Sequence, residues 1–561
     1  MAQGEQQVTD AAAPGRAVAA GRARAGSLLR HSAVMAAGSL VSRLTGFLRT
    51  AVVAAALGST LVGDAYTTAQ FIPGMIYELL LGGILASVVV PLLVRARDRD
   101  GDGGDAYAQR LLTLAVLALG ATTLLAVVAA PVLTVLLAGG DSTPAGRDLI
   151  TTLGYLILPT IFFYGLAALL AAVLNTRDHF AAPMWAPILN NAVVIGTFAT
   201  YIAVYGARPL APEELTGGQV LLVGVGTFLG IVVQSLALWP ALRRVGFRWR
   251  WRFDVRALRL RELARLGAWA FCYVAVSQLG LVVLIRLANE ASSADDEAAG
   301  PLIYNNTYLL LMMAHGIIAV SIITALLPRM SSAAAAGRYA DFTDDLSRGT
   351  RMSAVVLAPI AVGYAVLAQP IARTLFEYGA FTRSDSLATS LVLLVAAFAL
   401  VPFSVSQLYT FAFYALPDTR TPALVNLPVV AVRVGVQLIL AAVLAPVFVA
   451  AGLMLGNAVS FVLAAFASGV LLRRRVGPIG LRRILSTFGK AALAALGAAV
   501  AGFVVVRLVG AGLADDTRVA SVTQLTLGGV AIVAAYVGLA LALRMSEVAD
   551  VVGLVRRRLR R

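Results

Sequence analysis

The chain is dominated by apolar stretches that recur along its whole length. Fourteen of them approach the roughly 20 residues that a helix needs to cross a bilayer; they begin near residues 32, 69, 109, 149, 182, 218, 262, 301, 352, 387, 422, 447, 485 and 520. Inside a bilayer, every backbone N–H and C=O must be paired within the protein, and stretches of this length achieve that as helices. Of all residues, 59% are hydrophobic and only 13% are charged. We therefore expect an all-α polytopic membrane protein with about 14 transmembrane helices.

The basic residues gather in alternate loops between these stretches. They exceed the acidic residues by 45 to 29, an excess that in a soluble protein would suggest a nucleic-acid partner. With the N-terminus inside, the segments RARDRDGD, RRVGFRWRWRFDVRALRLRELARLG, GRYADFTDDLSRGTR, RRRVGPIGLRR and the terminal RRRLRR all face the cytoplasm, as the positive-inside rule requires. The distribution therefore predicts cytoplasmic termini, and it makes nucleic acid unnecessary as a partner.

An internal repeat divides the apolar stretches into two sets of six. Three pairs of residues lie 237 to 239 positions apart: Pro91 with Pro328, Gly140 with Gly379, and Pro183 with Pro422. Six helices per unit give both units the same orientation, so the repeat is parallel. The predicted organisation is a disordered cytoplasmic tail (1–30), an N-terminal lobe (31–246), a basic cytoplasmic inter-lobe loop (247–261), a C-terminal lobe (262–477), and two further helices with a basic tail (478–561).

Two arginines interrupt the first apolar stretch, in the segment SRLTGFLRT. Arg43 and Arg49 each cost roughly 2.5 to 3.5 kcal/mol near the centre of a membrane helix. They lie six residues apart, about 120° on an ideal helix, and a bend at Gly46 would let both enter a cavity between the lobes. The repeat offset places Arg286 in the matching helix of the C-terminal lobe. We interpret them as a cationic cavity for a multiply anionic substrate; the alternative is that one arginine extends to an interface or pairs with Asp64.

Three more charges lie in or near apolar surroundings. Asp64 either orients Arg49 or gates the outer mouth, or it is an exposed loop acid. Glu78 is expected to pair within the bundle or to lie at an interface. Arg433 is expected to face the interior of the C-terminal lobe, and all three are candidate substrate-site residues.

Metal and cofactor chemistry have little support in the sequence. Asp98, Asp100, Asp102 and Gly103 imitate the start of a calcium loop, but Gln109 stands where a bidentate glutamate is needed. The single cysteine, Cys272, excludes a disulfide framework. Because Walker, GxSxG and HExxH motifs are also absent from the sequence, we expect no metal, no cofactor and no enzymatic activity.

Several segments resemble a known family. The blocks SLVSRLTGFLRTAVVAAALGSTLVGDAYTTAQFIPGMIYELLLGGILASVVVP, LNTRDHFAAPMWAPILNNAVVIG, FEYGAFTRSDS and FYALPDTRTP are similar to the MurJ/MviN lipid II flippases, with residue usage like that of actinobacterial members. The resemblance implies a V-shaped pair of lobes in the bacterial plasma membrane. It also implies alternating access that moves undecaprenyl-pyrophosphate-linked disaccharide pentapeptide outward. The resemblance places family arginines that are needed for transport on Arg43 and Arg49, and the acidic residue that follows the first helix on Asp64.

The chain also departs from the family pattern. A family arginine at the start of helix 8 aligns with Leu309, and a glutamate of helix 2 aligns with Gly82. Arg286 is a candidate to replace the missing cation. Helices 7 and 11 contain no carboxylate near mid-span, so the membrane potential is the expected driving force rather than sodium.

Two other functions remain open at this point. One is export of another polyprenyl-linked glycan or of a small molecule, although a cationic cavity would repel cationic drugs. The other is a membrane glycosyltransferase, which the short outward loops disfavour. The sequence does not define an oligomeric state.

The inter-lobe loop gives a test of orientation. From Arg243 to Arg265 it holds nine arginines interleaved with Trp249 and Trp251, a pattern suited to anionic membrane lipids. In a chain whose Cys272 is replaced by serine, single cysteines in this loop should resist an impermeant maleimide on intact cells and react after permeabilisation. A cysteine at Asp516, in a predicted outer loop, is the positive control. Labelling of the inter-lobe loop from outside would overturn the orientation.

Overall fold

A computed structural model describes residues 37–82, 90–99, 101–140, 142–254, 260–513 and 517–549, and every regular element in these ranges is helical. The first half contains the helix Ala37–Leu57 and then α2 (Leu61–Tyr77), the π-helical η1 (Glu78–Gly82), α3 (Val90–Arg99), α4 (Asp105–Val128), α5 (Ala130–Ala138), α6 (Pro144–Ile157), α7 (Thr160–Thr176), α8 (Ala181–Tyr205), the 3-10 helix η3 (Pro212–Glu214), α9 (Gly217–Leu236) and α10 (Trp239–Arg244). The second half contains α11 (Leu260–Ala294), α12 (Pro301–Ala314), the π-helical η5 (His315–Ala319), α13 (Val320–Ala335), α14 (Tyr339–Val366), α15 (Ala368–Phe376), α16 (Arg383–Ala415), α17 (Arg420–Val443), α18 (Pro446–Val476), α19 (Leu481–Gly512) and α20 (Arg518–Ala542). The predicted tail, residues 1–30, lies outside the described residues.

The all-α membrane fold is confirmed. Among the described residues, 13 helices are long and apolar enough to cross a membrane. The remaining predicted span, beginning near residue 69, coincides with α2 and η1 and approaches α3, with residues 83–89 between them outside the described ranges.

Some charged segments predicted as loops are helical. Residues 339–351, placed in a cytoplasmic loop by their charges, form the first turns of α14. Arg338 pairs with Asp341, and Arg329 of α13 pairs with Asp345 at 2.7 Å. These pairs satisfy the charges locally, so the helix continues beyond its apolar part instead of ending where the apolar residues end.

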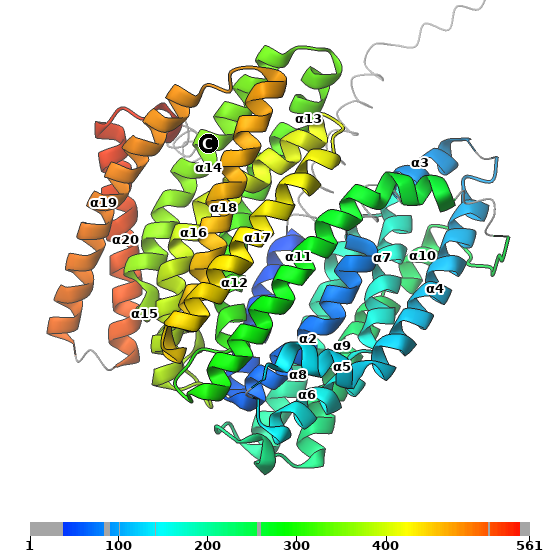
Figure 1. The fold of residues 1–561 in the computed structure, drawn as a ribbon, viewed down its shortest axis with the longest axis horizontal. Coiled ribbons are helices and arrows are strands. Elements are labelled where there is room, and N and C mark those ends of the chain that lie inside the picture. Colours follow the sequence, from blue (N-terminus) through cyan, green and yellow to red (C-terminus); the bar gives the residue numbers. More distant parts are fainter. Residues whose placement is uncertain are drawn as a thin grey trace, which may run out of the picture.

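The helices form two groups that meet at one end and diverge toward the other (Figure 1). In the first group α8 packs on α9, α2 on α6, and α4 on α7; in the second, α16 is central and packs on α12, α14 and α18. Helix α11 lies between the groups and packs on α17 and also on α5. The pair α19 and α20 lies at the far edge against α14 and α15. The groups follow the two predicted lobes, whose exact boundaries and common descent stay a prediction.

The two π-helical elements occupy matching places in the chain. The first residue of η5, His315, follows the first residue of η1, Glu78, by 237 positions, the same offset as Pro91 and Pro328. η5 lies directly between α12 and α13, and η1 directly follows α2. This correspondence supports the predicted parallel repeat with a feature that sequence patterns do not reveal.

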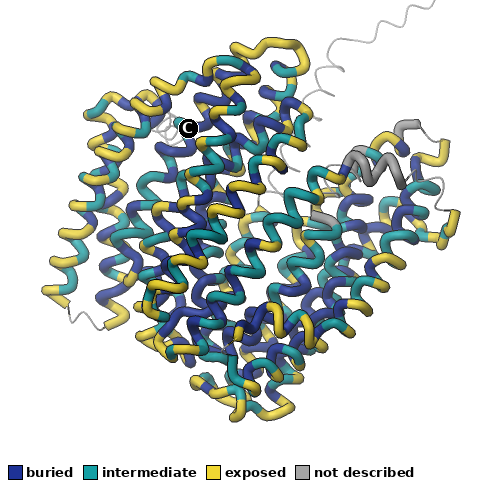
Figure 2. Tube along the Cα trace, in the orientation of Figure 1, coloured by how far each residue is buried: buried dark blue, intermediate teal, exposed yellow. Residues whose placement is uncertain are grey.

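The buried apolar core is continuous across the meeting end. The largest cluster joins Ala54 and Leu137 of the first half with Ile285, Leu302 and Phe381 of the second. Figure 2 shows the buried positions inside each helix group and many exposed positions on the outer faces. Large apolar side chains are exposed on those outer faces, as expected for surfaces that contact lipid.

The close packing of Gly165 against Leu119 predicts that a larger residue at this glycine lowers the stability of the protein. A Cβ on Gly165 of α7 would overlap the side chain of Leu119 on α4, whereas a Cβ on Gly196 of α8 would meet nothing within 4 Å. Gly165→Ala should therefore destabilise the protein by about 1–3 kcal/mol through overpacking. The matched Gly196→Ala should not, because alanine favours a helix. Thermal unfolding of both variants in one detergent checks this, and equal apparent Tm values for the two would contradict the packing.

Candidate functional site

The first helix is held against the N-terminal lobe by one amide. Asn191 of α8 donates from Nδ2 to the carbonyl oxygen of Ser42 at 3.2 Å and to the hydroxyl of Thr45 at 3.0 Å. Asn191 also lies next to Gly46, whose position a Cβ could occupy at an ordinary contact distance of 3.5 Å from the same nitrogen. On another side, the ring of Phe47 lies 5.7 Å from that of Phe376 in the C-terminal lobe. The helix therefore lies at the junction of the lobes.

Arg43 crosses this junction. A Cβ on Gly316 of η5 would overlap the Arg43 guanidinium, so the guanidinium lies directly against that backbone. Arg43 also acts electrostatically on the adjacent His315, which is buried and whose Nδ1 lies 2.9 Å from the Ser404 hydroxyl of α16. The cation of the first helix is thus placed on a polar part of the C-terminal lobe.

Arg49 points elsewhere. It lines a small cavity inside the N-terminal lobe together with Gln70, Tyr164 and Thr227. Nearby, Gln70 donates to the Tyr66 hydroxyl at 2.7 Å, and that hydroxyl lies 2.9 Å from the Thr227 hydroxyl. The structure therefore does not bring Arg43 and Arg49 into one cavity, which agrees with the wide angle between positions six residues apart on a helix.

Arg433 occupies a comparable place in the C-terminal lobe. Its Nη2 donates to the carbonyl oxygen of Ser277 at 3.3 Å, and its guanidinium lies against Gly280 of α11. Its charge acts on Tyr304 and Tyr308 of α12. Each lobe thus holds one arginine among tyrosines in its interior.

Arg286 is engaged at the end where the lobes meet. Its Nε donates to Oε1 of Glu290 at 3.1 Å, and the same carboxylate oxygen accepts from the Gly140 N–H at 3.1 Å. Arg286 therefore belongs to a contact between α11 and the loop after α5, and the structure does not place it beside Arg43 or Arg49.

Asp64 joins the lobes rather than pairing with an arginine. It is only 2% exposed, and its Oδ1 accepts from the Leu302 N–H at the start of α12 at 2.9 Å. Gly300 makes room, because a Cβ there would overlap the carboxylate. The interpretation of Asp64 as an exposed loop acid is wrong: α2 starts before it and α12 covers it.

Two further contacts at this end involve residues that the sequence does not single out. Asn289 of α11 donates to the Thr68 hydroxyl of α2 at 3.0 Å and to the Leu137 carbonyl at 3.0 Å. The Ala380 N–H donates to the Ala55 carbonyl at 2.8 Å. In the sequence, Asn289 is only an amide inside an apolar stretch, and Ala380 only follows the glycine of FEYGAFTRSDS. Neither pattern identifies the partner residue.

The remaining candidates lie outside this junction. Glu78 is exposed at the start of η1, and no ion pair between two described residues includes it. Asp102 accepts from the Ala106 and Gly104 N–H groups at the start of α4, which holds the pKa of its carboxyl below the usual value. The side chains of Asp98 and Asp100 lie outside the described residues. Within the described ranges, no three His, Cys, Asp or Glu side chains are grouped to hold a metal ion.

The start of the inter-lobe loop folds back on α4. Arg252 donates to the Gln109 side chain at 2.8 Å, and Arg110 pairs with Asp254 at 2.7 Å. The Arg110 hydrogen bond holds the pKa of Asp254 below its usual range. Trp251 and Phe253 stack on each other and remain exposed. An exposed aromatic row beside arginines suits a membrane–water interface.

Two helical lobes that meet at one end, with a cation of the first helix reaching across the junction, define a multi-pass membrane transporter. The family described as "Lipid II flippase MurJ" matches residues 53–513. The chain belongs to this family. The match begins after Arg43 and Arg49, so membership is independent of the arginines that carry the site argument.

Individual relatives agree with the family. The chain is 27% identical over 417 residues to "Probable lipid II flippase MurJ" of Rhizobium meliloti (strain 1021), covering 74% of this chain and 75% of the relative. It is 27% identical over 413 residues to "Lipid II flippase MurJ" of Burkholderia cenocepacia (strain J2315), covering 72% and 77%.

Solved structures share the fold. The structure "Lipid II flippase MurJ, inward closed conformation" matches with a TM-score of 0.71 and 19% identity, covering 91% of this chain and 99% of that one. An inward-facing multidrug resistance MATE family transporter of the MOP superfamily matches with a TM-score of 0.63 and 16% identity, covering 78% and 95%.

The contact between Arg43 and Gly316 gives a direct test. The three atoms nearest to a methyl group at Gly316 all belong to the flexible end of Arg43, so Gly316→Ala should leave the fold intact while displacing the guanidinium. We expect reduced transport at unchanged membrane abundance, measured by growth of a strain that depends on this chain. Gly363→Ala in α14, where a Cβ meets nothing within 4 Å, is the matched control. Equal growth of both variants would show that the contact is dispensable.

Proposed function

We propose that this chain is a transporter rather than an enzyme, and that it moves lipid II from the cytoplasmic to the outer leaflet of the bacterial plasma membrane. The observation that carries the proposal is Arg43, a cation kept in an apolar helix at the lobe junction and placed against the backbone of the other lobe. Membership of the flippase family over residues 53–513 supports the choice of substrate.

The geometry suggests how a pyrophosphate would be held. A guanidinium offers a planar fork of donors that matches two phosphate oxygens at once, and its attraction is strongest where water is excluded. Arg43 presents such a fork to the junction between the lobes. Arg49 and Arg433 supply positive potential from the interior of each lobe, so a multiply anionic head group entering between the lobes meets cations on both sides.

The contacts at the meeting end act as the outer gate. Asp64 with Leu302, Asn289 with Thr68, and the peptide groups of Ala380 and Ala55 each join the two lobes. With cytoplasmic termini, this end faces outward and the lobes diverge toward the cytoplasm (Figure 1). Release of the substrate outward would require these bonds to separate while the opposite end closes.

Orientation and membrane contacts follow from the charges. Both termini and the arginine-rich inter-lobe loop are cytoplasmic, and the loop contacts anionic lipids through its arginines and exposed aromatic rings. A cytoplasmic-negative membrane potential favours outward movement of an anion, which makes it the simplest driving force.

An exporter of another polyprenyl-linked glycan would share the pyrophosphate site, so the cargo must be measured directly. In cells depleted of this chain and lacking another flippase, outer-leaflet lipid II, detected with an impermeant probe, should fall. Unchanged lipid II in the outer leaflet would remove the proposed cargo.

Arginine variants test the site in the same assay. Arg43→Ala and Arg49→Ala should insert normally, since removing a membrane arginine relieves an insertion cost. Each should weaken transport about 10- to 100-fold at limiting substrate, because a charge-assisted hydrogen bond contributes roughly 1.5–3 kcal/mol. Lysine should rescue in part, since it lacks the guanidinium fork.

One control variant accounts for the loss of a positive charge. Arg208→Ala removes an exposed arginine of a predicted outer loop and makes the same change in charge. Arg286→Ala should match Arg49→Ala if the repeat pairs them functionally, and should match Glu290→Ala if Arg286 serves only the contact at the meeting end. Full growth of the double variant Arg43→Ala with Arg49→Ala would exclude the cationic site.

A further inference from the structure

The carboxyl group of Asp64 is buried between the lobes, and only part of its hydrogen-bonding capacity is used. Oδ1 accepts from the Leu302 N–H at 2.9 Å, whereas Oδ2 is enclosed and has no hydrogen-bond partner among the described residues. An ionised carboxylate offers about four acceptor sites on its two oxygens. The surroundings therefore satisfy a negative charge poorly, and the second oxygen is a place where a proton can bind.

A second carboxylate acts on Asp64 from the other lobe. Asp385 lies in the first turn of α16, and its Oδ2 accepts from the Thr382 N–H at 2.7 Å. Its charge acts on Asp64 across the lobe junction. Two carboxylates that approach each other disfavour a second negative charge. Because the two residues belong to different lobes, this repulsion is present only while the lobes meet.

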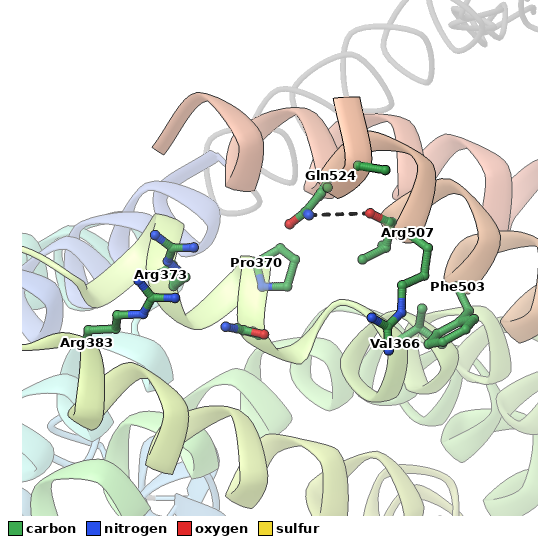
Figure 3. A pocket seen from close by; sticks show the side chains of 11 residues that line it. Val366, Pro370, Arg373, Arg383, Phe503, Arg507 and Gln524 are labelled. Carbon is green, nitrogen blue, oxygen red and sulfur yellow. Dashed lines mark hydrogen bonds between the residues drawn. The ribbon is translucent and has the colours of Figure 1, made fainter. Parts of the chain in front are cut away.

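Other charged groups at this end have partners of their own. These contacts join Arg147 to the Gly140 carbonyl oxygen, Arg286 to Glu290, and Arg373 to Glu377. Arg383 begins the same helix as Asp385, but Figure 3 shows it beside Arg373, and both line a cavity against α19 and α20. Positions two residues apart lie on nearly opposite sides of a helix. Asp385 is thus the charged group of the described chain that acts on Asp64.

The closed gate favours the protonated form of Asp64. This residue lies in the first turn of α2, between the first membrane helix and the predicted span that begins near residue 69. Burial raises the pKa of its carboxyl to about 7; the Leu302 N–H and the Ser292 hydroxyl oppose this rise, and the Asp385 charge adds to it. Separation of the lobes would expose Asp64 to water, where the pKa of an aspartate is about 4. The closed gate therefore binds a proton more tightly than the open gate.

The direction of the pH effect follows from this difference. Below the open-state pKa of about 4, Asp64 is protonated in both states and the closed gate has its full stability. Between about 4 and the closed-state pKa of about 7, opening releases a proton, so it becomes up to about tenfold easier with each pH unit. Above that range the carboxyl is ionised in both states and the dependence ends. Acid outside the cell therefore stabilises the closed gate.

We propose that the outer gate is a proton-binding site, at which Asp64 takes up a proton from outside when the lobes meet and returns it when they separate. The inference rests on the proposed outer gate and on the cytoplasmic termini. The proton enters and leaves on the same side, so none is carried across the membrane and the membrane potential stays the driving force. The proton sets how readily the gate opens.

Cysteine accessibility at the gate measures its closure directly. Ala380 is 0% exposed, and its N–H donates to the Ala55 carbonyl oxygen across the junction. In the Cys272→Ser chain, the reaction of Ala380→Cys with an impermeant maleimide is measured on intact cells between external pH 5 and 8. Each rate is divided by that of Arg208→Cys, an exposed position, which corrects for ionisation of the thiol. The ratio should rise up to about tenfold per pH unit and level off near pH 7.

Three variants assign the response to Asp64. Asp64→Asn keeps an acceptor for the Leu302 N–H but has no acidic proton, so its ratio should stay low at every pH. Asp385→Asn removes the neighbouring charge and should move the levelling-off to a lower pH. Asp148→Asn replaces an exposed acid of the same end and should keep the wild-type dependence. A wild-type ratio that is flat or falls with rising pH, or an unchanged response in Asp64→Asn, would overturn the proposal. If Asp64→Asn does not reach the membrane, the shift in Asp385→Asn decides.

Outer-leaflet lipid II, measured in the same cells, separates this inference from the proposed function. Normal export with a gate that ignores pH would reject the proton site and leave the proposed cargo standing. A pH-dependent gate in cells whose outer-leaflet lipid II does not depend on the chain would keep the proton site and reject the cargo. Labelling of Arg208→Cys only after permeabilisation would reject the orientation, and the outer gate with it.

Discussion

A cation in a membrane helix must find polar partners, and the organisation of this protein follows from that requirement. The Arg43 guanidinium lies against Gly316 in the opposite lobe, next to the buried side chain of His315. Because this contact crosses the junction, the surroundings of the arginine depend on how the two lobes are placed. An anionic substrate that attracts Arg43 would compete with this contact. Binding of the substrate is then coupled to the relative position of the two lobes.

The meeting end is built mainly from neutral hydrogen bonds and apolar packing, with two carboxylates, those of Asp64 and Glu290. Each hydrogen bond contributes about 0.5–1.5 kcal/mol net, so the few that join the lobes can separate without unfolding either one. The interior of each lobe is a different environment, where Arg49 and Arg433 are surrounded by tyrosines, amides and hydroxyl groups from several helices. A transporter needs this contrast, because the lobes must stay rigid while the contact between them changes.

The sequence predicted the parts of the structure that depend on one-dimensional patterns. The length of apolar stretches predicts the helices, and an arginine in an apolar stretch is conspicuous because of its cost, which is why Arg43 was identifiable. The residues that contact one another in the folded chain cannot be read from such patterns. The burial of Asp64 depends on α12 arriving from 238 residues away, and Asn289 looks like an ordinary amide until Thr68 is placed beside it. The direction of Arg49 likewise depends on how the first helix rotates against α8, where Asn191 donates to the Ser42 carbonyl oxygen.

The π-helical element η5 has a geometric consequence for the second half of the chain. A π turn contains one residue more than the α turn it replaces, so everything beyond it is rotated by about 100° relative to an uninterrupted α-helix. In the second half, this extra residue decides which side of α13 continues a given face of α12. Deleting one residue from η5 would restore α-helical geometry without breaking the helix, yet it would turn the downstream face away from its present neighbours. The orientation of α13 relative to α12 therefore depends on one extra residue.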